Sequence, residues 1–331
     1  MAIRLAQVAA RAGVSTATAS RVLNQVPSVD ASLAERVLAA AADLRYERNR
    51  VARNLRLQRT DMIGVLISDI QNPHFSELVY GIERAAFAAG FGVLLCNTDE
   101  QPERQRLYLR TLAQEQVAGL ILSATADSGD LISEIMAAGT PVVAVDREVA
   151  APGADAVVAD NAAAATLAAT RLIQAGHQRV ALIAGPLAVA TAAERHAGYL
   201  AAMHASRLPP IVEGADFRAA GGREAMRRIL GRRPRPTAVI VSNNLMATGA
   251  LEEIARQSVA VPQQIALISF DDPCWAALVA PPLTVLAQPV AAMAVRAVSL
   301  LASRIGGERG QPLLERFEFE LRVRRSCGTA A

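Results

Sequence analysis

The segment VAARAGVSTATASRVLN, residues 8–24, decides the fold of the N-terminal part of this chain. Leu5 to Ala12 is predicted to be a helix, because apolar residues recur there at the spacing of one helical face. Gly13 follows where a helix ends in the left-handed conformation, and Ser15 suits the N-cap of a second helix, Thr16 to Leu23. Two helices joined by such a short glycine turn predict a helix-turn-helix.

A third helix is expected from about Ser32 to Leu44. Ser32 is the predicted N-cap, and Glu35 stands three residues later, which is the spacing of a capping box. Residues 1–48 are therefore expected to form a small all-helical domain.

The outward face of the second helix carries side chains suited to DNA. The second helix of a helix-turn-helix lies in the major groove, and its outward positions here are Thr16, Ala17, Ser20 and Arg21. An arginine can pair with guanine or hold a phosphate, and small apolar groups suit thymine methyls. The alternative is an ordinary helical bundle with a surface arginine.

Charge is distributed unevenly along the chain. Residues 1–59 contain ten arginines and four acidic residues, a net charge of +6, whereas the remainder has a net charge of −3. A basic head on a slightly acidic body is typical of a nucleic-acid-binding head, although a solvated arginine face would give the same balance.

Residues 8–24, together with LRYERNRVARNL at 44–55, closely resemble the head and hinge of the lactose-repressor (LacI/GalR) family. The resemblance runs through the whole chain. It implies that Thr16 and Ala17 set operator specificity. It also implies contacts with bases or phosphates at these positions: Thr18, Ser20, Arg21 and Asn24.

The same resemblance implies a hinge helix at Asn49 to Leu55, including Ala52, within a linker at 49–59. Leu55 matches the leucine that wedges into the minor groove. A seven-residue helix is too short to be stable alone, but it can fold when paired with its twin on bent DNA. Glu47 and Arg48 depart from the family, in which many members have an apolar residue followed by proline.

From Met62 onward, short apolar strands alternate with helix-length segments. This rhythm predicts parallel sheets with helices on both faces. The expected strands are Ile63–Ser68, Val93–Asn97, Gly119–Ser123, Val142–Asp146, Val180–Ala184, Ala238–Ser242 and Ala266–Phe270. The clearest helices are expected at Ser76–Ala89, Ala162–Ala175 and Leu245–Arg256, with a last helix at Val290–Arg304 and edge strands within Phe317–Arg325.

The predicted fold class is an all-α helix-turn-helix head followed by an α/β body of two lobes. The body resembles the type I periplasmic sugar-binding fold used in the same family. The effector-binding and dimerisation domain is expected at 60–331. Lobe 1 would take about 60–160 plus 289–320, and lobe 2 about 161–288 plus 321–331.

Polar and aromatic residues cluster at the predicted strand ends, where open α/β folds bind ligands. The expected effector-binding residues are His74, Phe75, Arg147, Thr191, Arg195, Phe217, Asn243 and Asp271. Carboxylate, amide and guanidinium groups beside an aromatic face suit a ligand with many hydroxyl groups. The family resemblance implies that Asp271 and Arg195 form the principal ligand-binding pair. Taken singly, Asp271 and Asn243 also suit turn caps, His74 a surface position, and Phe75 and Phe217 the core.

The effector class is expected to be a sugar or sugar derivative, with a pentose favoured. Members resembling the purine repressor have an arginine at the position of Val189, so its absence disfavours a nucleobase. Arg147, with Asp271 and Arg195, favours a sugar or a sugar acid, and a phosphorylated sugar stays open.

Other function classes lack their motifs in this sequence. There is no P-loop, G-x-G-x-x-G or G-x-S-x-G, and the four histidines and three cysteines have no metal-ligand spacing, so neither an enzyme nor a metal or cofactor is expected. Without a signal peptide or a long apolar run, the chain is expected to be cytoplasmic.

The hypothesis is a homodimeric transcription regulator, by family habit a repressor. It would bind double-stranded DNA at a near-palindromic operator, with its affinity set by a small-molecule effector. The rivals are a solute-binding protein of a sugar transporter, which leaves residues 1–59 unexplained, and a Rossmann-type enzyme, which lacks its phosphate loop.

Overall fold

The computed structural model describes residues 3, 5–23, 29–44, 46, 60–125 and 128–328. They fall into two compact units, residues 1–58 and 59–331. Four predicted DNA-contacting residues lie outside the described residues: Asn24, Asn49, Ala52 and Leu55.

The N-terminal unit has three helices: α1 (Leu5–Ala12), α2 (Thr16–Leu23) and α3 (Ala31–Asp43). Val8, Ala19 and Val37, one from each helix, are fully buried in one small core. Its short helices are marginal alone, so this shared core is what stabilises them.

The turn between α1 and α2 forms as the sequence predicts. Gly13 has φ +63°, and the Val14 amide donates to the Ala9 carbonyl at 3.0 Å, which closes the end of α1. The Ser15 hydroxyl accepts the Thr18 amide at 3.0 Å, so Ser15 caps α2.

The predicted cap of the third helix is wrong. Asp30, not Ser32, is the N-cap of α3, and its carboxylate accepts the Ser32 amide at 2.8 Å and the Leu33 amide at 3.4 Å. The Ser32 hydroxyl also donates to Asp30 at 2.6 Å. An ionised carboxylate is a stronger acceptor than a hydroxyl at a helix N-terminus, so the N-cap lies two residues earlier than predicted.

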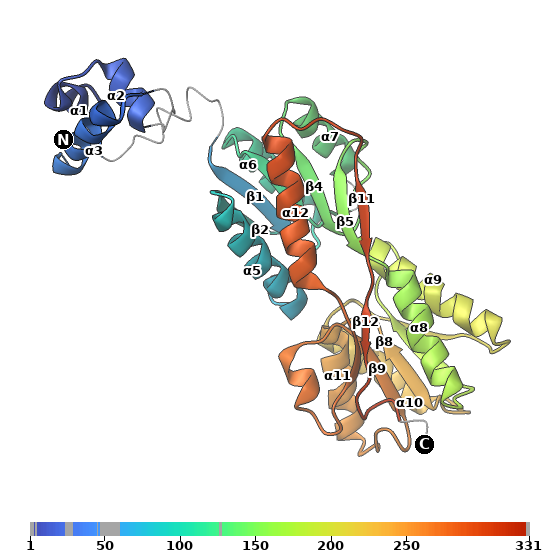
Figure 1. Ribbon diagram of the computed structural model, residues 1–331. Helices are drawn as coiled ribbons and strands as arrows, with labels where there is room; N and C mark the ends of the chain where they lie inside the picture. The colour runs from blue at the N-terminus through green and yellow to red at the C-terminus, as the bar shows by residue number, and fades with distance from the viewer. Residues whose placement is uncertain are drawn as a thin grey trace. The chain divides into compact units, whose positions relative to one another are not determined.

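The C-terminal unit consists of two α/β lobes with one six-stranded sheet each (Figure 1). The sheet of lobe 1 has the order β11-β5-β4-β3-β1-β2, and all its strand pairs are parallel. Its strands are β1 (Met62–Ile67), β2 (Gly92–Asn97), β3 (Gly119–Leu122), β4 (Val142–Asp146), β5 (Asp155–Ala159) and β11 (Leu314–Phe317).

Helices cover both faces of this sheet. On one face α5 (Pro73–Ala88) packs against α12 (Val290–Ile305), and on the other lie α6 (Pro102–Gln114) and α7 (Gly129–Ala137). Alternate residues of β1 serve the two faces: Val65 belongs to the core under α5 and α12, and Leu66 to the core under α6 and α7.

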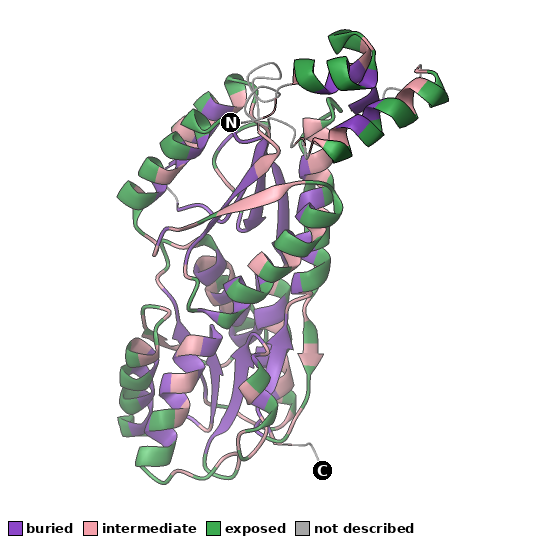
Figure 2. Ribbon diagram, turned by 90° about the vertical axis from the view of Figure 1, so that its left-hand side faces the viewer, coloured by how far each residue is buried: buried purple, intermediate pink, exposed green. Residues whose placement is uncertain are grey.

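Lobe 2 has the strand order β12-β10-β9-β8-β6-β7, and β12 pairs antiparallel with β10. Its strands are β6 (Val180–Ala184), β7 (Ile211–Gly214), β8 (Ala238–Val241), β9 (Ala266–Phe270), β10 (Thr284–Ala287) and β12 (Glu320–Arg322). The helices α8 (Asn161–Gln174) and α9 (Ala190–Ala205) cover one face, and α10 (Ala219–Gly231) and α11 (Asn244–Arg256) the other; a short 3-10 turn, η2, spans Cys274–Ala277. Figure 2 shows the buried sheets enclosed by helices whose outer sides are exposed.

The chain passes between the lobes three times: after β5, after β10, and between β11 and β12. Three strands missing from the sequence-based prediction, β5, β7 and β10, complete the sheets. The edge strands expected within Phe317–Arg325 are two separate strands, of which β11 ends at Phe317 in lobe 1 and β12 begins at Glu320 in lobe 2. Two strands were therefore expected correctly, but the expected range starts at the last residue of β11, so its beginning was wrong.

Candidate functional site

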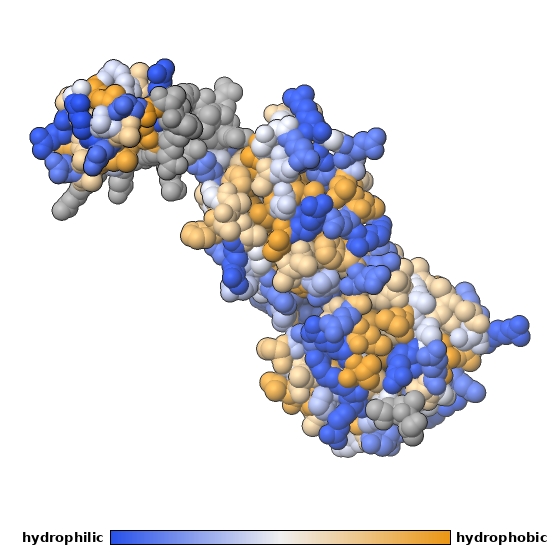
Figure 3. All heavy atoms as spheres, in the orientation of Figure 1, coloured by the Kyte–Doolittle hydropathy of each residue, from blue (hydrophilic) through white to orange (hydrophobic). Residues whose placement is uncertain are grey.

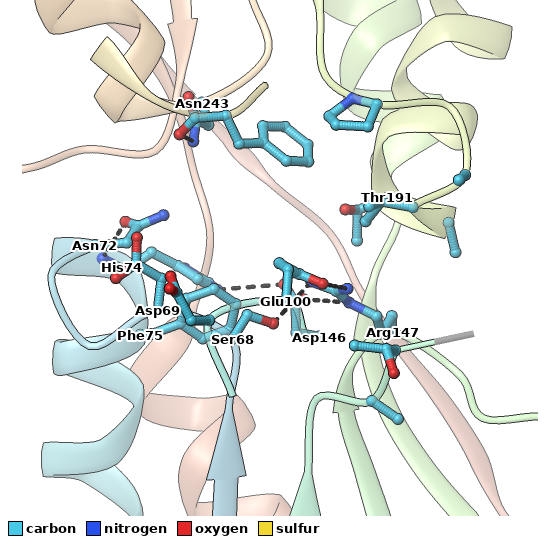
Figure 4. Close-up of a pocket in the computed structure, with 18 of the residues that line it drawn as sticks. Ser68, Asp69, Asn72, His74, Phe75, Glu100, Asp146, Arg147, Thr191 and Asn243 are labelled. Atoms are coloured by element: carbon cyan, nitrogen blue, oxygen red, sulfur yellow. Dashed lines mark hydrogen bonds and ion pairs between the residues drawn. The ribbon is translucent and has the colours of Figure 1, made fainter. Parts of the chain in front are cut away.

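A cavity of about 600 Å³ lies between the two lobes, at the carboxyl ends of the strands. All eight sequence-predicted effector residues line it: His74, Phe75, Arg147, Thr191, Arg195, Phe217, Asn243 and Asp271. Figure 4 shows side chains from both lobes converging on this space. The cavity exists because parallel strands of both sheets end at the same interface.

Arg147 is held by protein acceptors at the end of β4. Its guanidinium donates to both carboxylate oxygens of Glu100, at 2.8 and 3.1 Å, and to the Ser68 hydroxyl at 3.1 Å. Its Nε donates to Asp146 at 3.2 Å, and these contacts appear in Figure 4. Four of its five N–H groups are thus occupied, which orients the guanidinium rigidly.

His74 connects Asp146 with the crossing after β10. Its Nε2 lies 3.4 Å from an Asp146 oxygen, and its Nδ1 lies 3.4 Å from the amide nitrogen of Gln288. Gln288 in turn donates to Asp271 at 2.9 Å, which joins the end of β4 to the end of β9. The side chain of His74 is buried, so the alternative that His74 is a surface histidine is wrong.

Charges shift the pKa values of this buried pair. Burial lowers the pKa of His74, but the Asp146 hydrogen bond and the charges of Asp271 and Asp146 outweigh it, and the net shift is upward. Burial raises the pKa of Asp146, but His74, Arg147 and Arg195 outweigh that effect and hold it below its ordinary value. The cavity wall therefore keeps an ionised carboxylate at Asp146.

Arg195 projects from α9 into the same cavity. Its Nε donates to Asn161 at 2.8 Å, its Nη1 donates to the Ser242 carbonyl, and its guanidinium carbon lies 4.3 Å from the centre of the Phe270 ring. Three of its five N–H groups have no acceptor among the described residues, so they are available to a ligand.

Asp271 and Asn243 have protein roles as well as places in the cavity. Asp271 accepts from Asn244 at 3.3 Å and from Gln288, but it makes no direct hydrogen bond to Arg195. Asn243 caps α11 by accepting the Met246 amide at 2.8 Å, and it donates to the Phe217 carbonyl at 3.0 Å. Asn243 therefore acts as a cap, which was the alternative to a binding role, and its side chain also lines the cavity.

Backbone strain concentrates at the cavity. Among the described residues, eight non-glycine residues have positive φ, and five of them line the cavity: Asp99, Glu100, Asp146, Phe217 and Asp271. Such conformations persist where the surroundings over-determine them, often at ligand sites. Thr125 Oγ1, on a lining residue, is buried without a hydrogen-bond partner among the described residues. A polar ligand would satisfy this atom.

Several lining residues escaped the sequence-based prediction: Ser68, Asp99, Glu100, Arg218 and Gln288. Asp99 and Glu100 follow a correctly predicted strand, so the strand-end rule would have found them. Gln288 follows β10, which the pattern did not reveal. Asp272, beside Asp271, turns out of the cavity and pairs with Arg324 at 2.7 Å.

The N-terminal unit presents the predicted surface of α2. Thr16, Ala17 and Arg21 are exposed, and Thr18 and Ser20 are half-buried, whereas Ala19, Val22 and Leu23 face the core. No cluster of His, Cys, Asp or Glu side chains in the described ranges could hold a metal ion. None of the helices seen in those ranges is long and apolar enough to span a bilayer.

A helix-turn-helix unit followed by a two-lobed body with a polar cavity defines a DNA-binding regulator with a ligand-sensing domain. Family models agree: residues 4–49 match bacterial regulatory proteins of the lacI family, and residues 60–309 match periplasmic binding proteins and the sugar-binding domain of the LacI family. The chain therefore belongs to the LacI family. It is a DNA-binding transcription regulator and not an enzyme.

Known relatives cover nearly the whole chain. The ribose operon repressor of Escherichia coli strain K12 is 37% identical over 320 residues, which is 95% of both chains. The dimer of the lac repressor bound to operator and an anti-inducer has a TM-score of 0.88, with 29% identity, over 99% of this chain and 100% of that one. A LacI family regulator from Enterococcus faecium with bound ribose has a TM-score of 0.75, with 28% identity, over 81% and 98%.

Proposed function

We propose that this regulator senses an uncharged sugar in the cavity between its lobes and thereby changes its affinity for a near-palindromic operator. The observation that carries the proposal is the ring of fixed polar groups around the cavity: Arg147, Arg195, Asn243 and Asp271, with the rings of Phe75 and Phe217 beside them. Hydroxyl groups both donate and accept, so a sugar can satisfy guanidinium and carboxylate groups at once, while aromatic rings cover its apolar face.

The charge of the cavity favours an uncharged ligand over a sugar acid or sugar phosphate. Seven lining residues are acidic, namely Asp69, Asp99, Glu100, Asp146, Glu148, Asp216 and Asp271, whereas three are arginines, namely Arg147, Arg195 and Arg218. Two of these arginines already hold carboxylates, Glu100 and Asp99. The seven acidic residues outnumber the three arginines and His74, so an added anion would meet an excess of negative charge in a partly dry site. Neutral pentoses remain the favoured class, in line with the ribose bound by one relative.

The DNA-reading residues are proposed from their exposure on α2. Thr16, Ala17 and Arg21 would contact bases or phosphates, with Thr18 and Ser20 beside them. Asn24, and the hinge residues Asn49, Ala52 and Leu55, are assigned by the family resemblance alone. The proposed domains are the DNA-binding head at 1–48, the hinge and linker at 49–59, and the effector-binding body at 60–331.

A homodimer is proposed for the operator-bound state. Apolar side chains stay exposed on neighbouring elements of lobe 1: Tyr80 and Phe87 on α5, Leu95 on β2 and Val295 on α12. Figure 3 shows apolar side chains interrupting the polar surface of this lobe. A second copy covering them would place two heads on a two-fold operator. The site of action is then the cytoplasm, where operator DNA lies.

Calorimetric titration of the full chain with D-ribose, D-ribonate and D-ribose 5-phosphate tests the effector class. We expect binding of D-ribose only, lost in Asp271→Ala and retained in the control Glu252→Ala, an exposed residue of lobe 2. At about 100 times its dissociation constant, the sugar should add about 2.7 kcal/mol to stability. Preferential binding of either anion would contradict the charge argument.

Selection of bound sequences from a randomised DNA pool tests the operator. The full chain should enrich a near-palindrome, and Arg21→Ala should lose that enrichment. Unchanged enrichment by Arg21→Ala would contradict the assigned role of α2.

A further inference from the structure

An ion pair bridges the two lobes at the mouth of the cavity. Arg218, the residue before α10 in lobe 2, donates from Nη2 to an Asp99 oxygen in lobe 1 at 2.8 Å. Deeper in the interface, Asn244 of lobe 2 donates to Asn72 of lobe 1 at 2.9 Å. Both pairs join residues that line or adjoin the cavity, so separating the lobes would break them.

Acidic residues surround Arg218 from both lobes. The hydrogen bond with Asp99, followed by the charges of Asp99, Asp69 and Asp216, raises the pKa of Arg218 despite its partial burial. Arg218 thus neutralises carboxylates that would otherwise repel each other across the mouth. Removing its charge costs the ion pair and exposes this repulsion.

Asp99 also connects to the ligand-facing wall. Asp99 and Glu100 are consecutive, and both have φ +55°, so the turn has little freedom to rearrange. The Glu100 carboxylate holds Arg147 through two hydrogen bonds at 2.8 and 3.1 Å. The ion pair of Asp99 with lobe 2 therefore also restrains the neighbouring residue Glu100, which orients Arg147.

We propose that Arg218 and Asp99 form a latch that closes the cavity mouth and, through Glu100, positions Arg147 for the effector. Arg218 is then a positioning residue whose influence passes through the Asp99–Glu100 turn. The role in effector binding rests on the proposed function, but the closure itself does not. The latch lies in a region about half exposed, so its effect on affinity is modest.

The first measurement is the affinity of the full chain for D-ribose by calorimetry. Arg218→Gln should weaken binding about twofold to fivefold, the range of a partly exposed ion pair. Arg218→Lys keeps the charge and should stay within about twofold of wild type. The double variant Asp99→Asn/Arg218→Gln should lose less than the sum of the single losses, because both single variants break the same ion pair. The control is Arg227→Gln, whose partner Glu224 lies on the same helix.

The second measurement needs no ligand: hydrogen exchange of the full chain over residues 97–105. Arg218→Gln, a change in lobe 2, should raise exchange in this segment of lobe 1, whereas Arg227→Gln should leave it unchanged. If Arg218→Gln exchanges faster than wild type but wild type does not bind D-ribose, the latch is supported and the sugar proposal is contradicted. Unchanged exchange would overturn the latch. Equal D-ribose affinity in wild type and Arg218→Gln would overturn the positioning of Arg147.

Discussion

The ion pair between Asp155 and Arg304 should be a main stabilising contact of lobe 1. Arg304, in α12, donates from Nε and Nη2 to the two Asp155 oxygens, each at 2.8 Å. The Leu313 amide, just before β11, donates to Asp155 at 2.8 Å as well. One carboxylate at the start of β5 thus fastens both α12 and β11, the elements that return to lobe 1 from lobe 2.

Arg304→Met removes the charge and keeps most of the side-chain volume. The Asp155 side chain is 2% exposed, so the substitution leaves a buried carboxylate with one remaining hydrogen bond. Stranding a buried charge in this way costs about 3–5 kcal/mol. Asp155→Asn keeps an acceptor for Leu313 and frees Arg304, which is 19% exposed and can reach water, so it should cost about 1–3 kcal/mol.

The sign of the pH dependence follows from Asp155. Burial raises the pKa of Asp155, but the Arg304 and Leu313 hydrogen bonds outweigh it and lower the pKa from 3.8. The stabilisation is therefore present above about pH 3.8 and is lost as the pH falls through the lowered pKa. In Arg304→Met the carboxyl can protonate on acidification, so the gap to wild type should shrink.

Urea unfolding followed by circular dichroism measures the free energies, and hydrogen exchange at Ala156 locates the effect in the β5–β11 pair. The matched control is Arg316→Met, which breaks an exposed pair with Glu148 and should cost less than about 1 kcal/mol. If Arg304→Met costs no more than this control, or if its cost does not shrink in acid, the reasoning from the buried carboxylate is refuted.

Two further predictions concern the cavity and the head. The raised pKa of His74 means that its charged form stabilises the fold fully below about pH 6.5, and that this contribution is lost as the pH rises through the raised value. The thermal stability of wild type relative to His74→Gln should therefore be greater at about pH 5.5 than at about pH 8.5; a constant difference would contradict it. Gly13→Ala should destabilise the head by about 1–2 kcal/mol, because φ is +63° and an alanine is strained in this left-handed conformation. Exchange at the Val14 amide measures this, with Gly231→Ala, where no atom lies near the new Cβ and φ is not positive, as the control.

Much of the fold was predictable because its signals are local. The turn at Gly13 and Ser15, the apolar strand cores and the main helices depend on residues within a few positions of one another. Local signals did not reveal β5, β7 and β10. Of these, β7 is half-buried to exposed, so it lacks the apolar run that marked the predicted strands. The cap of α3 was misassigned because Asp30 and Ser32 are both good caps, and only the helix geometry chose between them.

The sequence by itself predicted eight of the residues that line the cavity, because many strand ends are recognisable and parallel strands end together. Only the tertiary structure decided how those residues are paired. Arg147 with Glu100, Arg218 with Asp99, and Arg304 with Asp155 join positions 47, 119 and 149 residues apart. No local pattern encodes such distant partners. They meet because the chain crosses between the lobes three times and brings separate strand ends to one interface.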